Sequence, residues 1–375
     1  MTYSVHQHWD PLKVCAVGRS YPPHFYNFIK NAKARSVMQR IAEETEEDYQ
    51  SLISLLEKFN VDVVRTNIVD DSEFYKVDGT YHEPPMCPRD NTAMIGDVFY
   101  SQSFRNTTPW NNIRGDSWPK DLPDHWNNIP GHVKQEITEQ FNLSKKDFYG
   151  PAYNDINNKV KQAGNKIIYD TDINTAEHVR IGRDLYHGTT ERERLNPETH
   201  SKYDQQFPEY RNWVVDTQGH ADGVFCAVKP GLIVSLYDKT DYNSEFPGWE
   251  VVHLPNESWS KMAKFLSLKQ KNGGKWWVPG EEDNDEFTAY VNEWFDHWVG
   301  YAEETVFDVN MLVIDQENVI CNSANPIVME AFERHGVTQH VCNFRHRYFW
   351  DVGLHCITSD LDREGQLNDY FPERS

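Results

Sequence analysis

The chain has 375 residues, enough for one large domain or two. It carries 58 acidic and 37 basic residues, and this net charge of −21 argues against partners such as nucleic acid or an anionic membrane surface and favours cationic or neutral small substrates. Without a long apolar run or a leader-like start, we expect a cytoplasmic protein with no membrane partner. The six cysteines form no C-x-x-C pair, so neither a disulfide framework nor a zinc site is indicated.

The first part of the chain predicts two strands around a long helix. Residues 13–18 and 61–65 have the apolar character of strands. Between them, apolar residues recur at helical spacing and predict a helix that ends near Asn60. The stripe consists of Ile41, Thr45, Tyr49, Leu52, Leu56 and Phe59. A tight hairpin is expected at residues 94–99.

The second half of the chain predicts two further hairpins. They pair residues 224–228 with 232–235 and residues 311–314 with 319–321. After the second one, Asn325-Pro326 begins a helix, Gly336 ends it, and residues 340–344 form another strand. This β-β-α-β rhythm also occurs at the start of the chain, shifted in phase. Such repetition favours a radial, propeller-like α/β assembly, with an ordinary α+β domain as the alternative.

Two polar, tryptophan-rich segments interrupt this rhythm. They are predicted insertions at about residues 104–163 and 256–303. Long insertions beside a site are often lids or rims. Surface loops with locally packed aromatic residues are the other interpretation.

Three motifs far apart in the chain contain the residues suited to covalent chemistry on a cation. They are Pro88-Arg89-Asp90, Gly219-His220-Ala221-Asp222-Gly223 and Gly353-Leu354-His355-Cys356. Cys356 is the candidate nucleophile, because a thiolate is a strong nucleophile once a nearby charge lowers its pKa. His220 is the candidate proton shuttle. The carboxylates of Asp90 and Asp222 match the forked donors of a guanidinium and predict a clamp for it.

Structural interpretations exist for the neighbouring residues. Cys226, Cys321 and Cys342 lie in apolar runs and are predicted to belong to the core. Cys87 precedes the Pro-Arg-Asp motif and is expected near the site. His355 is interpreted as a structural hydrogen-bonding residue, with a role as a second site group as the alternative.

The order of these motifs resembles the arginine:glycine amidinotransferase family along almost the whole chain. The further matching stretches are Trp9-Asp10-Pro11-Leu12, Val17-Gly18-Arg19, Arg180-Ile181-Gly182-Arg183-Asp184 and Pro230-Gly231. The resemblance implies one catalytic domain over residues 1–375, folded as a five-bladed α/β propeller of β-β-α-β units. It also implies that neither a metal nor an organic cofactor is needed. A homodimer is one possible oligomeric state.

The resemblance implies a ping-pong reaction on small-molecule substrates. Cys356 attacks the guanidino carbon of L-arginine, His220 protonates the departing amine, and L-ornithine leaves. An acceptor amine, deprotonated by His220, then takes the amidino group from the cysteine. Asp90 and Asp222 match the carboxylates that hold the guanidinium.

The triad of the family is altered in this chain. Asn174 stands where the family has the aspartate that orients the histidine. An amide oxygen can still orient an imidazole, but it stabilises an imidazolium less than a carboxylate does. Asp172 or Glu177 could take the role if the local alignment shifts, and Glu177 is also expected to contact the substrate.

The amino-acid end of the site differs as well. Lys239 stands where the family has an arginine that grips the substrate α-carboxylate. Glu303 and Glu304 stand where animal enzymes have a serine pair, and they would repel a carboxylate-bearing acceptor such as glycine. Two alternatives remain: a guanidino-group hydrolase of the same fold, resembling arginine deiminase, and a catalytically silent binder of guanidino compounds, suggested by Asn174.

Overall fold

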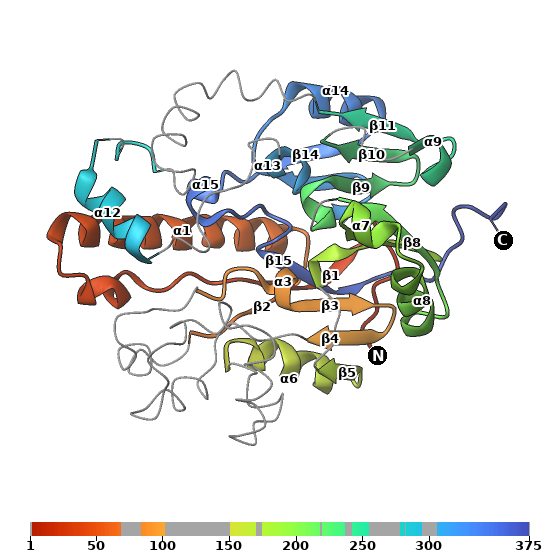
Figure 1. The fold of residues 1–375 in the computed structure, drawn as a ribbon, viewed down its shortest axis with the longest axis horizontal. Coiled ribbons are helices and arrows are strands. Elements are labelled where there is room, and N and C mark those ends of the chain that lie inside the picture. The colour runs from red at the N-terminus through yellow and green to blue at the C-terminus, as the bar shows by residue number, and fades with distance from the viewer. Residues whose placement is uncertain are drawn as a thin grey trace.

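The computed structural model describes residues 2–68, 84–101, 151–169, 175–217, 220–236, 242–254, 278–281, 283–294 and 306–374. Within them lie five sheets of three strands each, arranged around a common centre (Figure 1). In every sheet the first two strands are antiparallel, and the third is parallel to the middle one. The five-bladed α/β propeller predicted for this chain is therefore confirmed.

The strands of each sheet follow the chain order with one exception. The sheets are β15 (Thr358–Arg363), β1 (Leu12–Val17) and β2 (Asp62–Arg65); β3 (Thr92–Ile95), β4 (Val98–Ser101) and β5 (Lys166–Tyr169); β6 (His178–Ile181), β7 (Asp184–Thr189) and β8 (Arg211–Asp216); β9 (Phe225–Lys229), β10 (Leu232–Ser235) and β11 (Glu250–His253); and β12 (Leu312–Asp315), β13 (Asn318–Cys321) and β14 (Thr338–Val341). The exception is β15, which pairs antiparallel with β1. It explains the shifted phase at the start of the chain, because the C-terminal strand supplies the first strand of that sheet.

The longest helix is α1 (Ala32–Lys58), which begins at a capped residue. The side chain of Asn31 accepts hydrogen bonds from the backbone N–H groups of Lys33 and Ala34, two donors that a helix start leaves unpaired. The chain leaves the helix through Asn60, whose φ of 57° is left-handed. Five of the six residues of the predicted apolar stripe are buried. They are Ile41, Thr45, Tyr49, Leu52 and Leu56.

The remaining described helical elements are short. They are η1 (Pro23–Phe28), α3 (Pro88–Asn91), η4 (Pro151–Tyr153), α6 (Asn154–Gln162), η5 (Thr175–Glu177), α7 (Glu191–Arg194), α8 (Pro197–Gln206), η6 (Ala221–Gly223), α9 (Tyr242–Glu245), α12 (Asp285–Trp294), α13 (Val306–Val309), α14 (Pro326–Arg334) and α15 (Arg347–Trp350). Among the described helices, none combines the length and apolar character that a membrane crossing requires. The first turn of α14 is capped as predicted, because the Asn325 side chain accepts from the N–H of Ile327.

One local prediction needs correction. The last predicted strand, residues 340–344, is displaced, because β14 starts at Thr338 and ends at Val341, where it runs parallel to β13. The Arg-Ile-Gly-Arg-Asp stretch is the tip of the β6–β7 hairpin, where Gly182 has a φ of 61° that favours glycine. Large parts of the two predicted insertions lie outside the described residues, so their boundaries stay a prediction.

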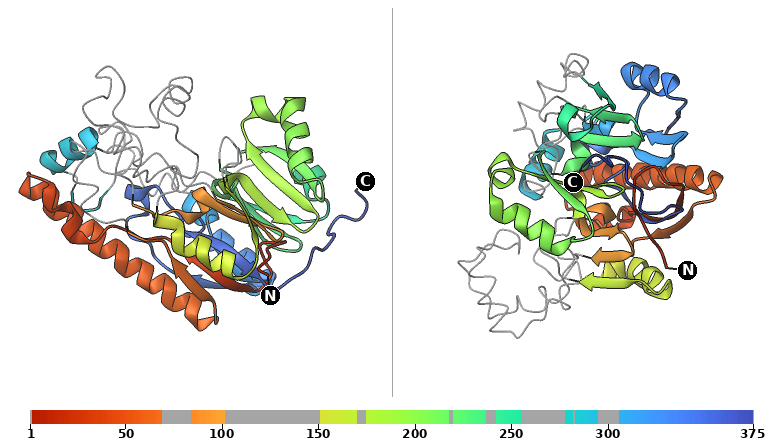
Figure 2. Two further views of the ribbon diagram at one scale, coloured as in Figure 1. Left: turned by 90° about the horizontal axis from the view of Figure 1, so that it is seen from below. Right: turned by 90° about the vertical axis from the view of Figure 1, so that its right-hand side faces the viewer.

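The core connects α1 to the segment that leads into β15. In the largest apolar cluster, residues of α1 and β1 pack with Phe344, Phe349 and Leu354. The indole N–H of Trp350 donates to Thr45 of α1 over 2.8 Å. The C-terminal segment after β15 runs along the β6–β7–β8 sheet (Figure 2), where Arg211 donates to the backbone oxygen of Phe371 over 3.0 Å. The chain on both sides of β15 is therefore anchored.

Candidate active site

Each of the three motifs lies directly before the first strand of a different sheet, β3, β9 or β15. Asp90 lies on α3 and Asp222 on η6, with His220 as the residue directly before η6. Cys356 lies in the turn directly before β15. Its Sγ lies 3.5 Å from Oδ2 of Asp222. Nδ1 of His220 lies 3.8 Å from Oδ1 of Asp90, so the fold brings together the thiol, the imidazole and both carboxylates.

The charges around Cys356 differ from the sequence-based expectation. Burial raises the pKa of the Cys356 thiol well above its usual range, and the carboxylates of Asp222 and Asp90 raise it further. A nearby charge was expected to lower this pKa, but the carboxylates that act on the thiol among the described residues, Asp222 and Asp90, are negative. In the free protein the thiol is therefore protonated at neutral pH, and a bound cation would be needed to offset the two carboxylates.

His355 holds Asp222 in place. Its Nδ1 donates to Oδ2 of Asp222 over 2.8 Å. Burial and the guanidinium of Arg89 lower the pKa of His355 to about 4, so the imidazole is neutral. Burial alone would raise the pKa of Asp222, but the hydrogen bond from His355 helps lower it to about 2. These contacts agree with the interpretation of His355 as a structural hydrogen-bonding residue.

One oxygen of Asp222 is available for a ligand. Its Oδ1 is buried and has no hydrogen-bond partner among the described residues. A buried carboxylate oxygen without a donor is costly. A guanidinium N–H group would supply that donor.

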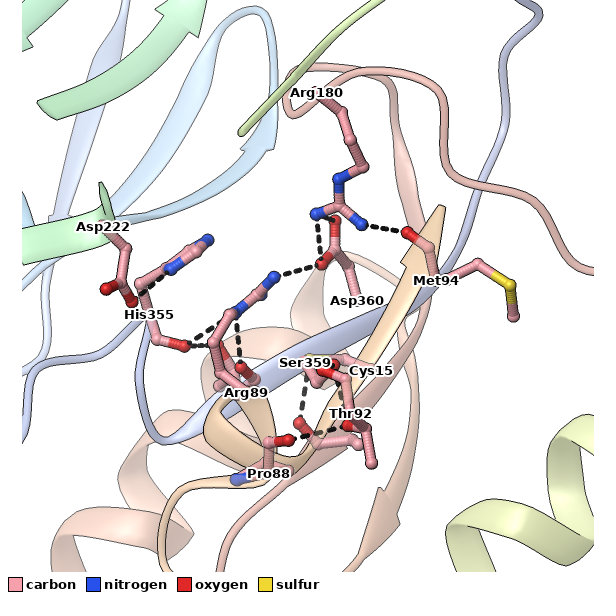
Figure 3. Close-up of polar contacts among 12 residues, drawn as sticks. Cys15, Pro88, Arg89, Thr92, Met94, Arg180, Asp222, His355, Ser359 and Asp360 are labelled. Carbon is pink, nitrogen blue, oxygen red and sulfur yellow. Dashed lines mark hydrogen bonds and ion pairs between the residues drawn. The ribbon is translucent and has the colours of Figure 1, made fainter. Parts of the chain in front are cut away.

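A buried carboxylate, Asp360, anchors the residues beneath the site (Figure 3). Arg89 donates from Nη1 to Oδ1 of Asp360 over 2.8 Å, and Arg180 donates to both oxygens over 2.8 and 2.9 Å. Arg363 donates from Nε over 2.7 Å. Although burial opposes ionisation, these guanidinium groups hold the pKa of Asp360 well below its usual range. The arginines of two sequence motifs therefore hold the scaffold together.

Among the remaining predicted site residues, Glu177 is described by the structure. Glu177 ends η5, a turn that packs against both α3 and η6. Burial raises the pKa of Tyr203 on α8, and the carboxylate of Glu177 raises it further. The other predicted residues lie outside the described residues. They are Asp172, Asn174, Lys239, Glu303 and Glu304.

The other cysteines separate into two groups. Cys321 and Cys342 are buried, as predicted for core residues, whereas Cys226 is half-buried. Cys87 is also half-buried and lies close enough to contribute to the raised pKa of Cys356. No group of three or more His, Cys, Asp or Glu side chains suited to a metal ion occurs within the described residues.

Sequence reasoning missed Asn310 and Asp360. Asn310 donates from Nδ2 to Sγ of Cys356 over 3.1 Å. It stands directly before a predicted strand, where an asparagine usually belongs to a turn. Folding places it against Gly353 of the last motif, where a Cβ would lie only 2.5 Å from Cγ of Asn310, and this contact is not visible in the sequence.

Comparisons with known proteins give distant matches to amidinotransferases. No protein-family model matches this chain. The mitochondrial glycine amidinotransferase of Gallus gallus is 21% identical over 395 aligned residues, which cover 97% of this chain and 83% of the relative. The resemblance to the amidinotransferase family is confirmed.

Two solved structures of amidinotransferases share the fold. One is SxtG from Microseira wollei, of the saxitoxin biosynthetic pathway, with a TM-score of 0.60, 17% identity and coverage of 98% of this chain and 99% of that one. The other is the inosamine-phosphate amidinotransferase of Streptomyces griseus, with a TM-score of 0.60, 16% identity and the same coverage. At these identities the two structures show that the fold is shared.

Proposed function

We propose that this protein transfers the amidino group of L-arginine through Cys356 to an acceptor amine and releases L-ornithine, within one catalytic domain. The observation that carries the proposal is the position of the Cys356 thiol, with Asp222 at 3.5 Å and Asp90 close enough to raise its pKa. Two carboxylates beside a protonated thiol suit a planar cation. Once bound, the guanidinium offsets their charge and lowers the pKa of the thiol.

In the first half of the reaction the amidino group moves to the enzyme. Cys356 gives its proton to His220, and Sγ forms a bond to the guanidino carbon. The bond from that carbon to the ornithine nitrogen breaks, and His220 returns the proton to this nitrogen. The charge of the amidino group stays between Asp90 and Asp222 throughout, so the clamp stabilises both the substrate and the intermediate.

In the second half the acceptor amine takes the place of ornithine. His220 removes a proton from this amine, and the amine nitrogen forms a bond to the amidino carbon. The bond from that carbon to Sγ then breaks, and His220 returns the proton to the released thiolate of Cys356. The sequence-predicted acidic pair Glu303 and Glu304 would repel a carboxylate. We therefore propose an acceptor that carries positive charge or no carboxylate, in contrast to the glycine named for the relative from Gallus gallus.

The test is incubation with L-arginine in the absence of an acceptor, followed by intact-mass measurement. The expected result is the added mass of one amidino group together with one equivalent of ornithine. Cys356→Ala should abolish the adduct, whereas Cys87→Ala, which removes a neighbouring thiol, should retain it. An adduct that persists in Cys356→Ala contradicts the proposal. Citrulline in place of an adduct would show that water is the acceptor and that the protein is a hydrolase.

The acceptor is identified in a second experiment. Arginine is supplied with a panel of diamines, neutral amines and glycine, and the guanidino products are separated by mass spectrometry. Diamines or neutral amines should exceed glycine. A preference for glycine over all of them would contradict the proposed acceptor class.

A further inference from the structure

Asn310 makes four hydrogen bonds that join η6 to the turn containing Cys356. The residue follows α13 directly and is only 1% exposed. Its Nδ2 donates to the backbone oxygen of Asp222 and to Sγ of Cys356, each over 3.1 Å. Its Oδ1 accepts from the backbone N–H groups of His355 over 2.9 Å and Cys356 over 3.1 Å.

These contacts use the full capacity of an amide side chain. A primary amide has two N–H donors and two acceptor lone pairs, and each has a partner here. The orientation of the amide follows from the same contacts. If oxygen and nitrogen were exchanged, two N–H donors would face the backbone donors of His355 and Cys356. The amide nitrogen therefore faces the sulfur.

The amide matters because the sulfur lies in a negative environment. Asp222 is 3.5 Å from Sγ, and Asp90 contributes to the same field. Among the described residues, the Asn310 side chain and a backbone hydrogen bond from Gly353 act in the opposite direction. A hydrogen bond to a charged group is about twice as strong as one between neutral groups, so the contact strengthens when the thiol ionises.

We propose that Asn310 is a catalytic residue, whose Nδ2–H stabilises the thiolate of Cys356 while its Oδ1 fixes the turn that presents the sulfur. This inference rests on the proposed function and adds to it a group that touches the reacting atom. Negative charge develops on Sγ before it attacks the guanidino carbon and again when the acceptor removes the amidino group. Asn310 therefore acts in both halves of the reaction.

Gly353 provides independent support for this arrangement. A Cβ atom at residue 353 would lie only 2.5 Å from both Cβ and Cγ of Asn310, far closer than carbon atoms approach without a bond. The close approach of the amide thus requires glycine at the start of the Gly-Leu-His-Cys motif. The motif contains a glycine because the amide packs against the turn.

The test compares Asn310→Asp with a matched control. The variant keeps an acceptor for the two backbone N–H groups but replaces the donor facing Sγ by an oxygen. The control is Asn322→Asp, since Asn322 is also 1% exposed and donates to a backbone oxygen, that of Phe307, over 3.1 Å. The measurement is the rate of iodoacetamide alkylation of the Cys356 peptide between pH 8 and 9.5, where the rate follows the thiolate fraction.

Loss of a hydrogen bond to a charged group should make Asn310→Asp about ten- to hundred-fold slower than the wild type at each pH. The alkylation rate of the Asn322→Asp control should stay within about two-fold of the wild-type rate, because this change does not reach the thiol. An unchanged alkylation rate in a folded Asn310→Asp protein overturns the proposal.

A second measurement covers the case in which Asn310→Asp does not fold. In wild-type protein with ¹⁵N-labelled asparagine, the side-chain amide resonance of one asparagine should shift when Cys356 is replaced by alanine. If no asparagine side-chain amide shifts, the contact does not exist in solution and the proposal is wrong. Neither measurement uses arginine. A slow Asn310→Asp variant combined with no amidino adduct in the wild type would refute the proposed function, and with it the catalytic role of Asn310, but would still establish that its amide stabilises the thiolate.

Discussion

Replacing Asp222 by asparagine should change thiol reactivity and turnover in opposite directions. In the free protein, burial raises the pKa of the Cys356 thiol, and the Asp222 carboxylate, whose Oδ2 lies 3.5 Å from Sγ, raises it further. With arginine bound, the same carboxylate would hold the guanidinium. Asp222→Asn preserves the shape and can still accept the 2.8 Å hydrogen bond from His355. The variant therefore removes the negative charge with little other change.

The size of the effect follows from Coulomb's law. Two unit charges 3.5 Å apart interact by about 5 kcal/mol at an effective dielectric constant of about 20. That energy corresponds to about 3.5 pKa units. Because Cys356 is half-buried and partly screened by solvent, a decrease of about one to three units is expected. At pH 8, iodoacetamide should alkylate Cys356 about ten- to thousand-fold faster than in the wild type.

Turnover with arginine should fall in the same variant. Loss of one carboxylate leaves the guanidinium half paired, which should lower kcat/KM by about ten- to hundred-fold or more. Alkylation and arginine turnover are measured on one preparation. Asp315→Asn, in the β12–β13 hairpin, makes the same charge change outside the site and should alter neither. Alkylation that is slower or unchanged in Asp222→Asn would refute this account of the thiol.

Three further predictions concern the proton shuttle, the scaffold and acid stability. His220→Ala should lower kcat by about two to four orders of magnitude with a smaller change in KM, and a near-normal kcat would exclude His220 as the shuttle. Asp360→Asn should lower the free energy of unfolding, measured in urea, by about 3–5 kcal/mol, because it leaves three buried arginines without their carboxylate. Asp362→Asn on the same strand is the control and should lower this free energy far less. The pKa of His355 is lowered to about 4 and that of His187, by burial, to about 3, so the unfolded chain binds more protons below pH 6.5. The unfolding temperature should therefore fall as the pH decreases from 6.5 towards 4, and a flat profile over that window would contradict these shifts.

The elements that the sequence predicted correctly depend on local signals. The cap at Asn325, the proline that follows it and the stripe along α1 each act within a few residues, so their spacing is enough to predict them. The motif order then predicted which distant segments meet at the site. Cys356, His220, Asp90 and Asp222 do lie together in the structure.

The features that escaped prediction depend on long-range geometry. Asn310 contacts a turn 45 and 46 positions away in the sequence, and no local pattern distinguishes it from a turn asparagine. The sign of the electrostatic field at Cys356 could not be predicted from the sequence either, because it depends on which carboxylates lie beside the sulfur after folding. The position of β14 depends on its parallel pairing with β13 rather than on its own apolar run.

Arg89 joins two segments of the candidate site through its guanidinium. Its Nε donates to the backbone oxygens of His355 over 3.3 Å and Thr358 over 3.1 Å, while Nη1 donates to Asp360. The guanidinium thus ties α3, which carries Asp90, to the turn that carries Cys356. A lysine would keep the charge but cannot bond the carboxylate and both carbonyl groups at once.

Arg89→Lys should therefore reduce kcat by displacing the thiol relative to its carboxylates. A displacement of about 1 Å can cost about a hundred-fold in rate. The matched control is Arg211→Lys, because Arg211 also joins a carboxylate, that of Asp184, to backbone oxygens, but on the β6–β7–β8 sheet. Both variants should lose stability, and only Arg89→Lys should lose turnover at a temperature where both are folded. Equal kcat values in the two variants would show that the link from Arg89 to the turn does not position Cys356.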